Sequence, residues 1–309
     1  MTTPIDSAAL RAGLIETARA MNRRGINVNK SGNVSVRALS DEDGRAGFLI
    51  TPTGIPYESL EPDDIVFVPF GGGAHRGRRR ASSEWEMHER VLARRPDVSA
   101  VVHTHSAYAT ALACQRLRIP AFHYMVAAAG GDAIEVAPYK TFGTPELADA
   151  AAAALAERNA CLLEHHGVLA LGKTLEKALA LAAEVENLAR QYVLVRGLGE
   201  PRLIESDEMR RVIEKFRTYG MQPAEGDAAV IPAKPQEPSP PERWCTASGA
   251  TVACTEKVKV LSENWEEARS MMTDMFEDAV LLGVSKASFR QAMHALVDSL
   301  ECAYEEKKE

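Results

Sequence analysis

A cluster of prolines constrains this chain most, because it divides the 309 residues into separate parts. Six of the sixteen prolines lie within residues 223–241. Proline lacks an amide hydrogen and fixes φ, so such a stretch forms neither a helix interior nor a central strand. We therefore predict three regions: a body over residues 1–222, a proline-rich linker over 223–248 and an acidic appendage over 249–309.

Charge, cysteine content and hydropathy exclude several classes of protein. The net charge of −7 gives no general reason to bind nucleic acid or an anionic membrane surface. Five cysteines without a Cys-x-x-Cys pair argue against a disulfide scaffold and against a thiolate metal cage. No apolar run approaches the roughly 20 residues of a membrane span, and no basic, apolar leader opens the chain. We expect a cytoplasmic globular protein without nucleic-acid or membrane partners.

The body has the residue pattern of a mixed α and β fold. Apolar residues at helical spacing alternate with short apolar runs that Gly, Pro and Asp residues bound. Ser83 followed by Glu86 predicts a capping box at the start of one helix. Helices are predicted at 7–24, 83–94, 145–158 and 175–195, and strands at 34–36, 48–50, 65–68, 98–102 and 168–171.

The appendage is predicted to be a helical hairpin that turns at Gly283. Residues 249–309 hold seven basic and twelve acidic residues, and two stretches each carry an apolar helical face. Two helices cannot enclose a core alone, so we expect these faces to dock on another surface without a part in catalysis. The residues expected to dock are Trp265, Met272, Phe276, Phe289, Leu296 and Leu300.

A candidate metal site begins at His103-Thr104-His105, which ends an apolar strand. Side chains two apart in a strand point the same way, so both imidazoles can reach one ion. Imidazole suits zinc, and a catalytic zinc keeps three protein ligands and one open position. His-x-His alone is weak evidence, but His165-His166-Gly167 follows another apolar run and Glu84 could add a carboxylate. His88, four residues after Glu84, is expected to support Glu84 or fill the core rather than bind metal.

Three loops have residues suited to holding an anion. Gly32-Asn33, Thr53-Gly54 and Ser82-Ser83 offer backbone amides or hydroxyls, and the last pair opens a predicted helix. Each alone is typical of an ordinary turn. Together they predict a phosphate pocket next to Glu84.

These segments, in this order, resemble the class II aldolase/adducin family. The resemblance covers roughly residues 10 to 222. The matching segments are 31–35, 50–58, 82–85, 101–105, 119–125, 137–139, 141–144, 165–167 and 215–220.

The resemblance implies a three-layer α/β/α fold with a central, mostly antiparallel sheet, and a homotetramer with active sites between subunits. It also implies one zinc per subunit, held by His103, His105 and His166, with Glu84 as an added ligand in the resting enzyme. Of the histidine pair, His166 beside Gly167 is expected to be the ligand. His165 is expected to be structural.

The implied reaction is reversible cleavage of a ketose 1-phosphate into dihydroxyacetone phosphate and an aldehyde such as L-lactaldehyde. The ketose would be L-fuculose 1-phosphate or a related deoxy-ketose phosphate. In this mapping Glu84 exchanges the proton on the dihydroxyacetone phosphate carbon. Tyr124, supplied by a neighbouring subunit, handles the proton of the C4 oxygen, and Tyr219 lies near the aldehyde end. The phosphate pocket maps onto Gly32, Asn33, Thr53, Gly54, Ser82 and Ser83.

Other activities within the family stay open. A methylthioribulose 1-phosphate dehydratase would also use zinc and a phosphate pocket. Ribulose phosphate 4-epimerases carry aspartate where this chain has Glu84, which disfavours that activity. Adducin-like binding modules lose the metal ligands, whereas all three histidines are present here.

Three departures from the family pattern put the substrate in doubt more than the reaction type. Ala81 stands where proline usually precedes the Ser-Ser-Glu. The loop 71–80 is rich in glycine and arginine, so its residues 76–80 are either solvated or add positive potential near the phosphate. The chain also runs almost ninety residues past Tyr219, and the C-terminal end shapes the aldehyde pocket in this family.

Overall fold

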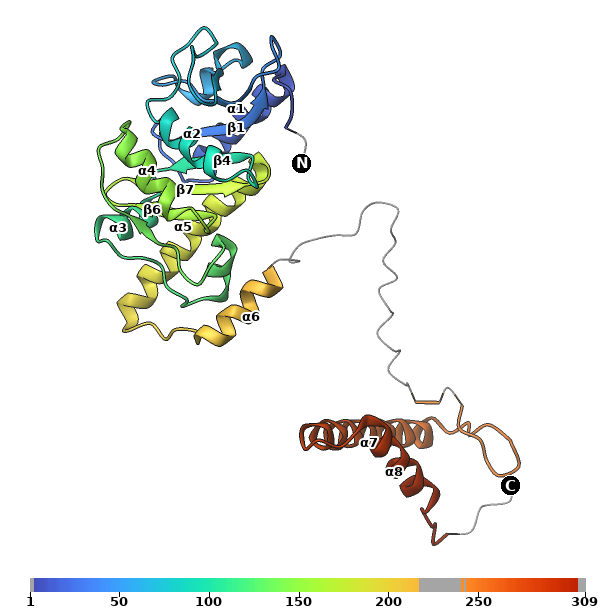
Figure 1. The fold of residues 1–309 in the computed structure, drawn as a ribbon. Helices are drawn as coiled ribbons and strands as arrows, with labels where there is room; N and C mark the ends of the chain where they lie inside the picture. The colour runs from blue at the N-terminus through green and yellow to red at the C-terminus, as the bar shows by residue number, and fades with distance from the viewer. Residues whose placement is uncertain (1–2, 217–239, 242, 305–309) are drawn as a thin grey trace. The chain divides into compact units, whose positions relative to one another are not determined.

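The computed structural model describes residues 3–216, 240–241 and 243–304. It divides the chain into two units, Met1–Met221 and Gln222–Glu309, which we describe separately (Figure 1). We keep the name body for the first unit and the name appendage for residues 249–309, which lie within the second unit.

A seven-stranded sheet forms the centre of the body, in the order β3-β2-β1-β4-β7-β6-β5. All neighbouring strands are antiparallel except β5 and β6, which are parallel. The strands are β1 Asn33–Leu39, β2 Ala46–Ile50, β3 Val66–Pro69, β4 Ala100–Thr104, β5 Val136–Ala137, β6 Ala160–Leu163 and β7 Gly167–Gly172. The prediction of a mostly antiparallel sheet is confirmed.

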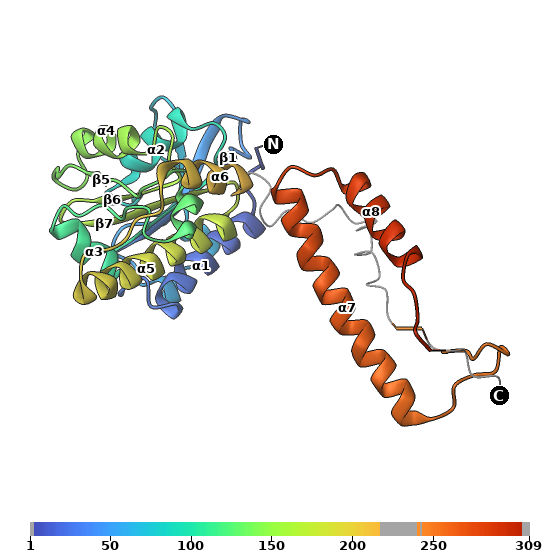
Figure 2. The same ribbon diagram turned by 90° about the horizontal axis from the view of Figure 1, so that it is seen from below.

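Helices cover both faces of this sheet and complete the predicted three layers (Figure 2). One face is covered by α1 Ala8–Arg23, α3 Ala107–Cys114 and α5 Leu175–Leu198, and the other by α2 Trp85–Arg94 and α4 Pro145–Ala154. The helix α6 Ser206–Phe216 contacts the 3-10 helix η3 Tyr124–Ala129. Two shorter 3-10 turns, η1 Tyr57–Ser59 and η2 Pro62–Asp64, follow β2.

Strand β4 shows how alternation places both the core and the site. Ala100 and Val102 pack toward α1, α3 and α5, whereas Val101 packs toward α2 and α4. Successive side chains of a strand point to opposite faces, so His103 shares the face of Val101, under α2. Strand β4 lies between β1 and β7 in the sheet, so this histidine is fully buried.

Some predicted elements differ from the structure. The predicted capping box of Ser83 and Glu86 is wrong, because α2 begins one residue later with Glu84 at its N-cap and without a side-chain cap bond. The Ser82 hydroxyl accepts a hydrogen bond from the Glu84 amide instead, at 3.3 Å. The helix predicted at 145–158 ends at Ala154, and the strands β5 and β6 were not predicted.

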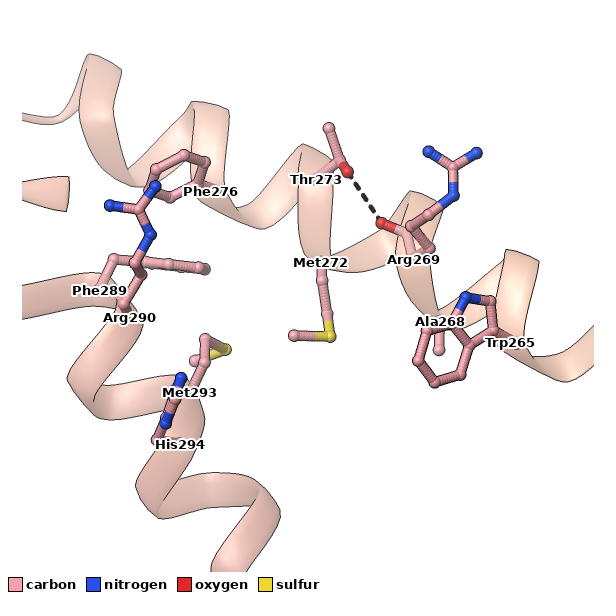
Figure 3. A pocket seen from close by; sticks show the side chains of 10 residues that line it. All are labelled: Trp265, Ala268, Arg269, Met272, Thr273, Phe276, Phe289, Arg290, Met293 and His294. Atoms are coloured by element: carbon pink, nitrogen blue, oxygen red, sulfur yellow. Dashed lines mark hydrogen bonds between the residues drawn. The ribbon is translucent and has the colours of Figure 1, made fainter. Parts of the chain in front are cut away.

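The appendage contains two helices, α7 Thr255–Leu281 and α8 Lys286–Asp298, which turn at Gly283 as predicted. Neither helix has a buried residue. Trp265, Met272 and Phe276 of α7 face Phe289 and Met293 of α8 across a groove of about 650 Å³ (Figure 3). The Phe276 and Phe289 rings approach to 5.1 Å between centroids. The expected docking of this groove stays a prediction. Among the described residues, every helix is too short or too polar to cross a bilayer.

Candidate metal centre

Three histidines converge at the end of β4. His103 lies within the strand, His105 follows it, and His166 comes from the turn between β6 and β7. His103 Nε2 lies 3.0 Å from His105 Nε2. One ligand atom from each histidine lies within 4.8 Å of the others. The structure therefore brings the predicted triad together.

The β6–β7 hairpin delivers the third histidine through a tight turn. The His166 amide donates to the Leu163 carbonyl at 3.0 Å. His165 takes φ of 54°, in the left-handed region that side chains rarely adopt. Gly167 is required here, because a Cβ at that position would lie 2.3 Å from the Thr104 carbonyl oxygen. The turn thus points the His166 ring toward His103 and His105, whereas the neighbouring His165 ring is half-exposed.

Glu84 reaches the triad from the N-terminus of α2. Its Oε2 lies 3.2 Å from His103 Nε2 and its Oε1 lies 3.2 Å from His166 Nε2. Asn33 Nδ2 donates to Oε2 at 2.9 Å. Oε1 is buried and has no hydrogen-bond partner. A buried carboxylate oxygen without a donor implies a missing positive group nearby.

The hydrogen bonding of His103 points to the same conclusion. Its Nδ1 lies 2.9 Å from the Val168 carbonyl, which only accepts, so Nδ1 carries the hydrogen. In the neutral ring, Nε2 then presents a lone pair toward Glu84 and His105. The Nε2 atoms of His103 and His105 and the Glu84 carboxylate thus lie close enough together to share one divalent cation. The donor set of three histidine nitrogens and one carboxylate fits such an ion.

Burial and the mutual charges of the site set its protonation states. Burial, aided by His103, lowers the pKa of both His105 and His166 to about 4, so these rings stay neutral and able to bind metal. Burial opposes ionisation of Glu84, but His103, His166 and Asn33 outweigh it and hold the Glu84 pKa well below its usual value. Burial also works against a charged His103, yet Glu84 raises its pKa overall.

A cleft of about 350 Å³ opens beside the triad. Three residues of the segment 137–144 line it without having received a role from the sequence: Tyr139, Lys140 and Phe142. Tyr139 and Phe142 belong to segments that resemble the family, whereas Lys140 lies between those segments and had no signal of its own. The other lining residues are Ser31, Ser83, Glu84, His105, His165 and His166.

The residues predicted to bind phosphate fall into two groups. Ser83 is exposed and lines the cleft, and Thr53 and Gly54 are exposed in the turn after β2. Gly32, Asn33 and Ser82 are buried. A Cβ at Gly32 would lie 2.3 Å from the His103 carbonyl oxygen, so glycine lets this loop approach β4.

Of the two predicted tyrosines, Tyr124 does not line this cleft. Tyr124 is 47% exposed on η3, where it stacks on His123 at 4.9 Å between ring centroids. Tyr219 lies outside the described residues.

The arginine-rich loop is paired with carboxylates. Arg76 bonds Asp43 at 2.6 Å and Arg78 bonds Asp64 at 2.9 Å. Arg79 also bonds Asp64, at 2.7 Å. These pairs favour a role for the loop in holding its own surface together over one at the phosphate.

Comparison with known proteins identifies the family of the body. Residues 12–193 match the Class II Aldolase and Adducin N-terminal domain. This chain belongs to the class II aldolase/adducin family. It is similar to a 5-methylthioribulose-1-phosphate/5-deoxyribulose-1-phosphate aldolase of Rhodospirillum rubrum, at 50% identity over 75% of this chain and 99% of the relative. It is also similar to the L-fuculose phosphate aldolase of Escherichia coli, at 48% identity over 68% of this chain and 94% of the relative.

Solved structures agree with this assignment. An L-fuculose 1-phosphate aldolase superposes with a TM-score of 0.65 at 38% identity, covering 69% of this chain and 98% of that one. The protein is therefore a class II aldolase, a lyase. In this class II aldolase the histidine triad is a site for a divalent metal ion. A quarter or more of the chain extends beyond each of these matches.

Proposed function

We propose that this class II aldolase is zinc-dependent and reversibly cleaves a ketose 1-phosphate into dihydroxyacetone phosphate and an aldehyde. The observation that carries the proposal is the ionised, buried Glu84 carboxylate 3.2 Å from two of three converging histidines. A metal site with a carboxylate at its edge suits a reaction in which negative charge and a proton move at neighbouring carbon atoms.

The substrate is proposed from the relatives. The two relatives of 50% and 48% identity are named for different ketose phosphates. The candidates are therefore L-fuculose 1-phosphate, 5-deoxyribulose 1-phosphate and 5-methylthioribulose 1-phosphate. All three would release dihydroxyacetone phosphate and would differ only in the aldehyde.

In the proposed reaction the bond between C3 and C4 breaks. The C4 hydroxyl loses its proton and becomes the aldehyde carbonyl, while the electron pair of the broken bond stays on C3 and takes up a proton. His103, His105 and His166 would hold the zinc, and Glu84 would be a fourth ligand before substrate binds. The bound zinc would polarise the C2 carbonyl and stabilise the negative charge that develops beside it. Glu84, once released, would deliver the proton to C3.

The remaining assignments belong to the same proposal. Ser83 and the turn at Thr53-Gly54, with Gly32, Asn33 and Ser82, would hold the phosphate. Tyr124 would serve the C4 oxygen in a neighbouring subunit of a homotetramer, and its 47% exposure leaves it available for this. Tyr219 would lie near the aldehyde, and the enzyme would work in the cytoplasm. Residues 1–222 would be the catalytic domain, with the linker at 223–248 and the appendage at 249–309.

The test is to incubate the purified protein with each of the three ketose 1-phosphates and to measure dihydroxyacetone phosphate by its enzyme-coupled reduction. We expect release from at least one of them. Formation of a diketone without dihydroxyacetone phosphate would instead identify a dehydratase. Interconversion of pentulose phosphate epimers without cleavage would identify an epimerase. Absence of dihydroxyacetone phosphate, of a diketone and of epimerised substrate would support a non-catalytic binding module.

A further inference from the structure

A line of buried hydrogen bonds leads from the interior of the sheet to Glu84. Ser35 Oγ lies 2.7 Å from His88 Nδ1. His88 Nε2 is hydrogen-bonded to Asn33 Oδ1, and Asn33 Nδ2 donates to Glu84 Oε2 at 2.9 Å. Ser35 and His88 are fully buried, and Asn33 and Glu84 are 3% and 5% exposed. These partners are therefore shielded from bulk water.

The direction of each bond follows from the Asn33 amide. Its NH₂ group faces Glu84 and its carbonyl oxygen faces His88. That carbonyl only accepts, so His88 Nε2 must carry a hydrogen. Burial lowers the pKa of His88 to about 3, so the ring is neutral and its Nδ1 accepts from the Ser35 hydroxyl. Every donor in the line thus points toward the carboxylate.

Two secondary-structure elements hold this line in place. Asn33 and Ser35 are alternate residues of β1 and face α2, while Val34 and Val36 face the opposite core. Asn33 pairs with His103 in the ladder between β1 and β4, so the amide lies beside the triad. His88 lies one turn after Glu84 on α2 and faces the sheet. A strand in the middle of the sheet and the helix above it thus fix both ends of the line.

We infer that Ser35 and His88 are positioning residues for the proposed base: they lock the amide of Asn33, which holds Glu84 Oε2 and leaves Oε1 free to move a proton. This inference rests on the proposed aldolase function. Oε1 is the carboxylate oxygen without a hydrogen-bond partner, and it lies 3.2 Å from His166 Nε2 on a residue that lines the cleft. The two carboxylate oxygens therefore differ, because Asn33 donates a hydrogen bond to Oε2 whereas Oε1 has no hydrogen-bond partner.

The experiment measures proton exchange alone, which needs no knowledge of the aldehyde. The zinc-loaded full-length protein is incubated with dihydroxyacetone phosphate in D₂O, and NMR follows loss of a C–H signal at its hydroxymethyl carbon. In each turnover Glu84 would take a proton from carbon and return a deuteron from solvent. The variants are His88→Leu, His88→Gln and Ser35→Ala. Val91→Ala, a fully buried core change on the same helix outside the line, is the matched control.

We expect His88→Leu to lower the exchange rate at saturating substrate by about 10- to 100-fold, with zinc content unchanged and KM within a few-fold. His88→Gln should recover most of this loss, because its amide can still donate to Asn33. Ser35→Ala should lower the rate by about 2- to 5-fold, and it keeps the test valid if His88→Leu fails to fold. Val91→Ala should lower the melting temperature without changing the rate.

Two results would overturn the inference. One is a His88→Leu rate equal to that of Val91→Ala. The other is a Ser35→Ala rate equal to the wild-type rate together with no recovery in His88→Gln. Absence of exchange in the zinc-loaded wild-type protein is a separate result, because it would overturn the proposed function itself and this inference with it.

Discussion

The body and the appendage each contain a long amphipathic helix, yet the two helices differ in what they bury. Helix α5 has 24 residues and buries eight of them against the sheet, whereas α7 has 27 residues and buries none. The difference teaches that apolar periodicity predicts a helix but not a core, because burial needs a second surface. In the body that surface is a sheet with helices on both faces.

The body and the appendage also differ in the functional residues that they contain. Among the described residues, the only cluster of metal-ligating side chains is the histidine triad of the body. The family match also lies within the body, at residues 12–193. We therefore expect the reaction to take place in the body, without a direct part for the appendage.

The largest effect should come from Glu84→Gln. The amide keeps the shape of the side chain but loses the base, so kcat for cleavage should fall by about 10²- to 10⁴-fold while the protein still folds. Steady-state release of dihydroxyacetone phosphate measures this. Glu86→Gln, a change two residues along α2, is the control and should keep wild-type turnover. If Glu84→Gln kept most of its turnover, another residue would have to be the catalytic base.

Two phenylalanine substitutions, one in the body and one in the appendage, should differ in their effect on the free energy of unfolding of the body. Phe48→Ala removes a fully buried ring from the core of the body and should lower its free energy of unfolding by about 3–5 kcal/mol. Phe276→Ala, in the appendage groove, should leave the unfolding of the body within about 0.5 kcal/mol of wild type. Denaturant titration followed by zinc release reports on the body alone. Equal losses in the two variants would show that the appendage is part of the same cooperative core.

The smallest effect should come from ending the chain after Gln222. We expect kcat/KM of the shortened protein to stay within about 2-fold of wild type, because the candidate site lies entirely in the body. Its mass in solution should still be that of a tetramer. Loss of activity with zinc still bound would mean that the appendage closes the active site.

The sequence predicted the fold class and the metal triad well, for physical reasons that particular residues show. His103 and His105 share one side of a strand end, and Gly167 marks a close approach beside His166. The short motifs His-x-His and His-Gly specify both of these local arrangements. Strands β5 and β6 escaped prediction because β5 is only two residues long and the short run of β6 follows directly on the alanine-rich stretch predicted as one helix to residue 158.

The hydrogen-bond line behind Glu84 could not be predicted from the sequence alone. The alternation of β1 places polar residues at 33, 35 and 37, which is typical of a strand with one face in water. Here α2 covers that face. Arg37 donates to carbonyls at the end of α2 and to Val98, so its charge is satisfied inside. Only the tertiary arrangement reveals that Asn33 and Ser35 are buried and that Asn33 contacts Glu84.

A divalent metal bound by the body's triad should carry the activity. The most direct measurement is the zinc content of the full-length protein and of two single variants, His103→Ala in the triad and the exposed His294→Ala in the appendage. We predict about one zinc per chain for wild type and for His294→Ala, and loss of both zinc and cleavage activity for His103→Ala. Full zinc retention with unchanged activity in His103→Ala would contradict the account.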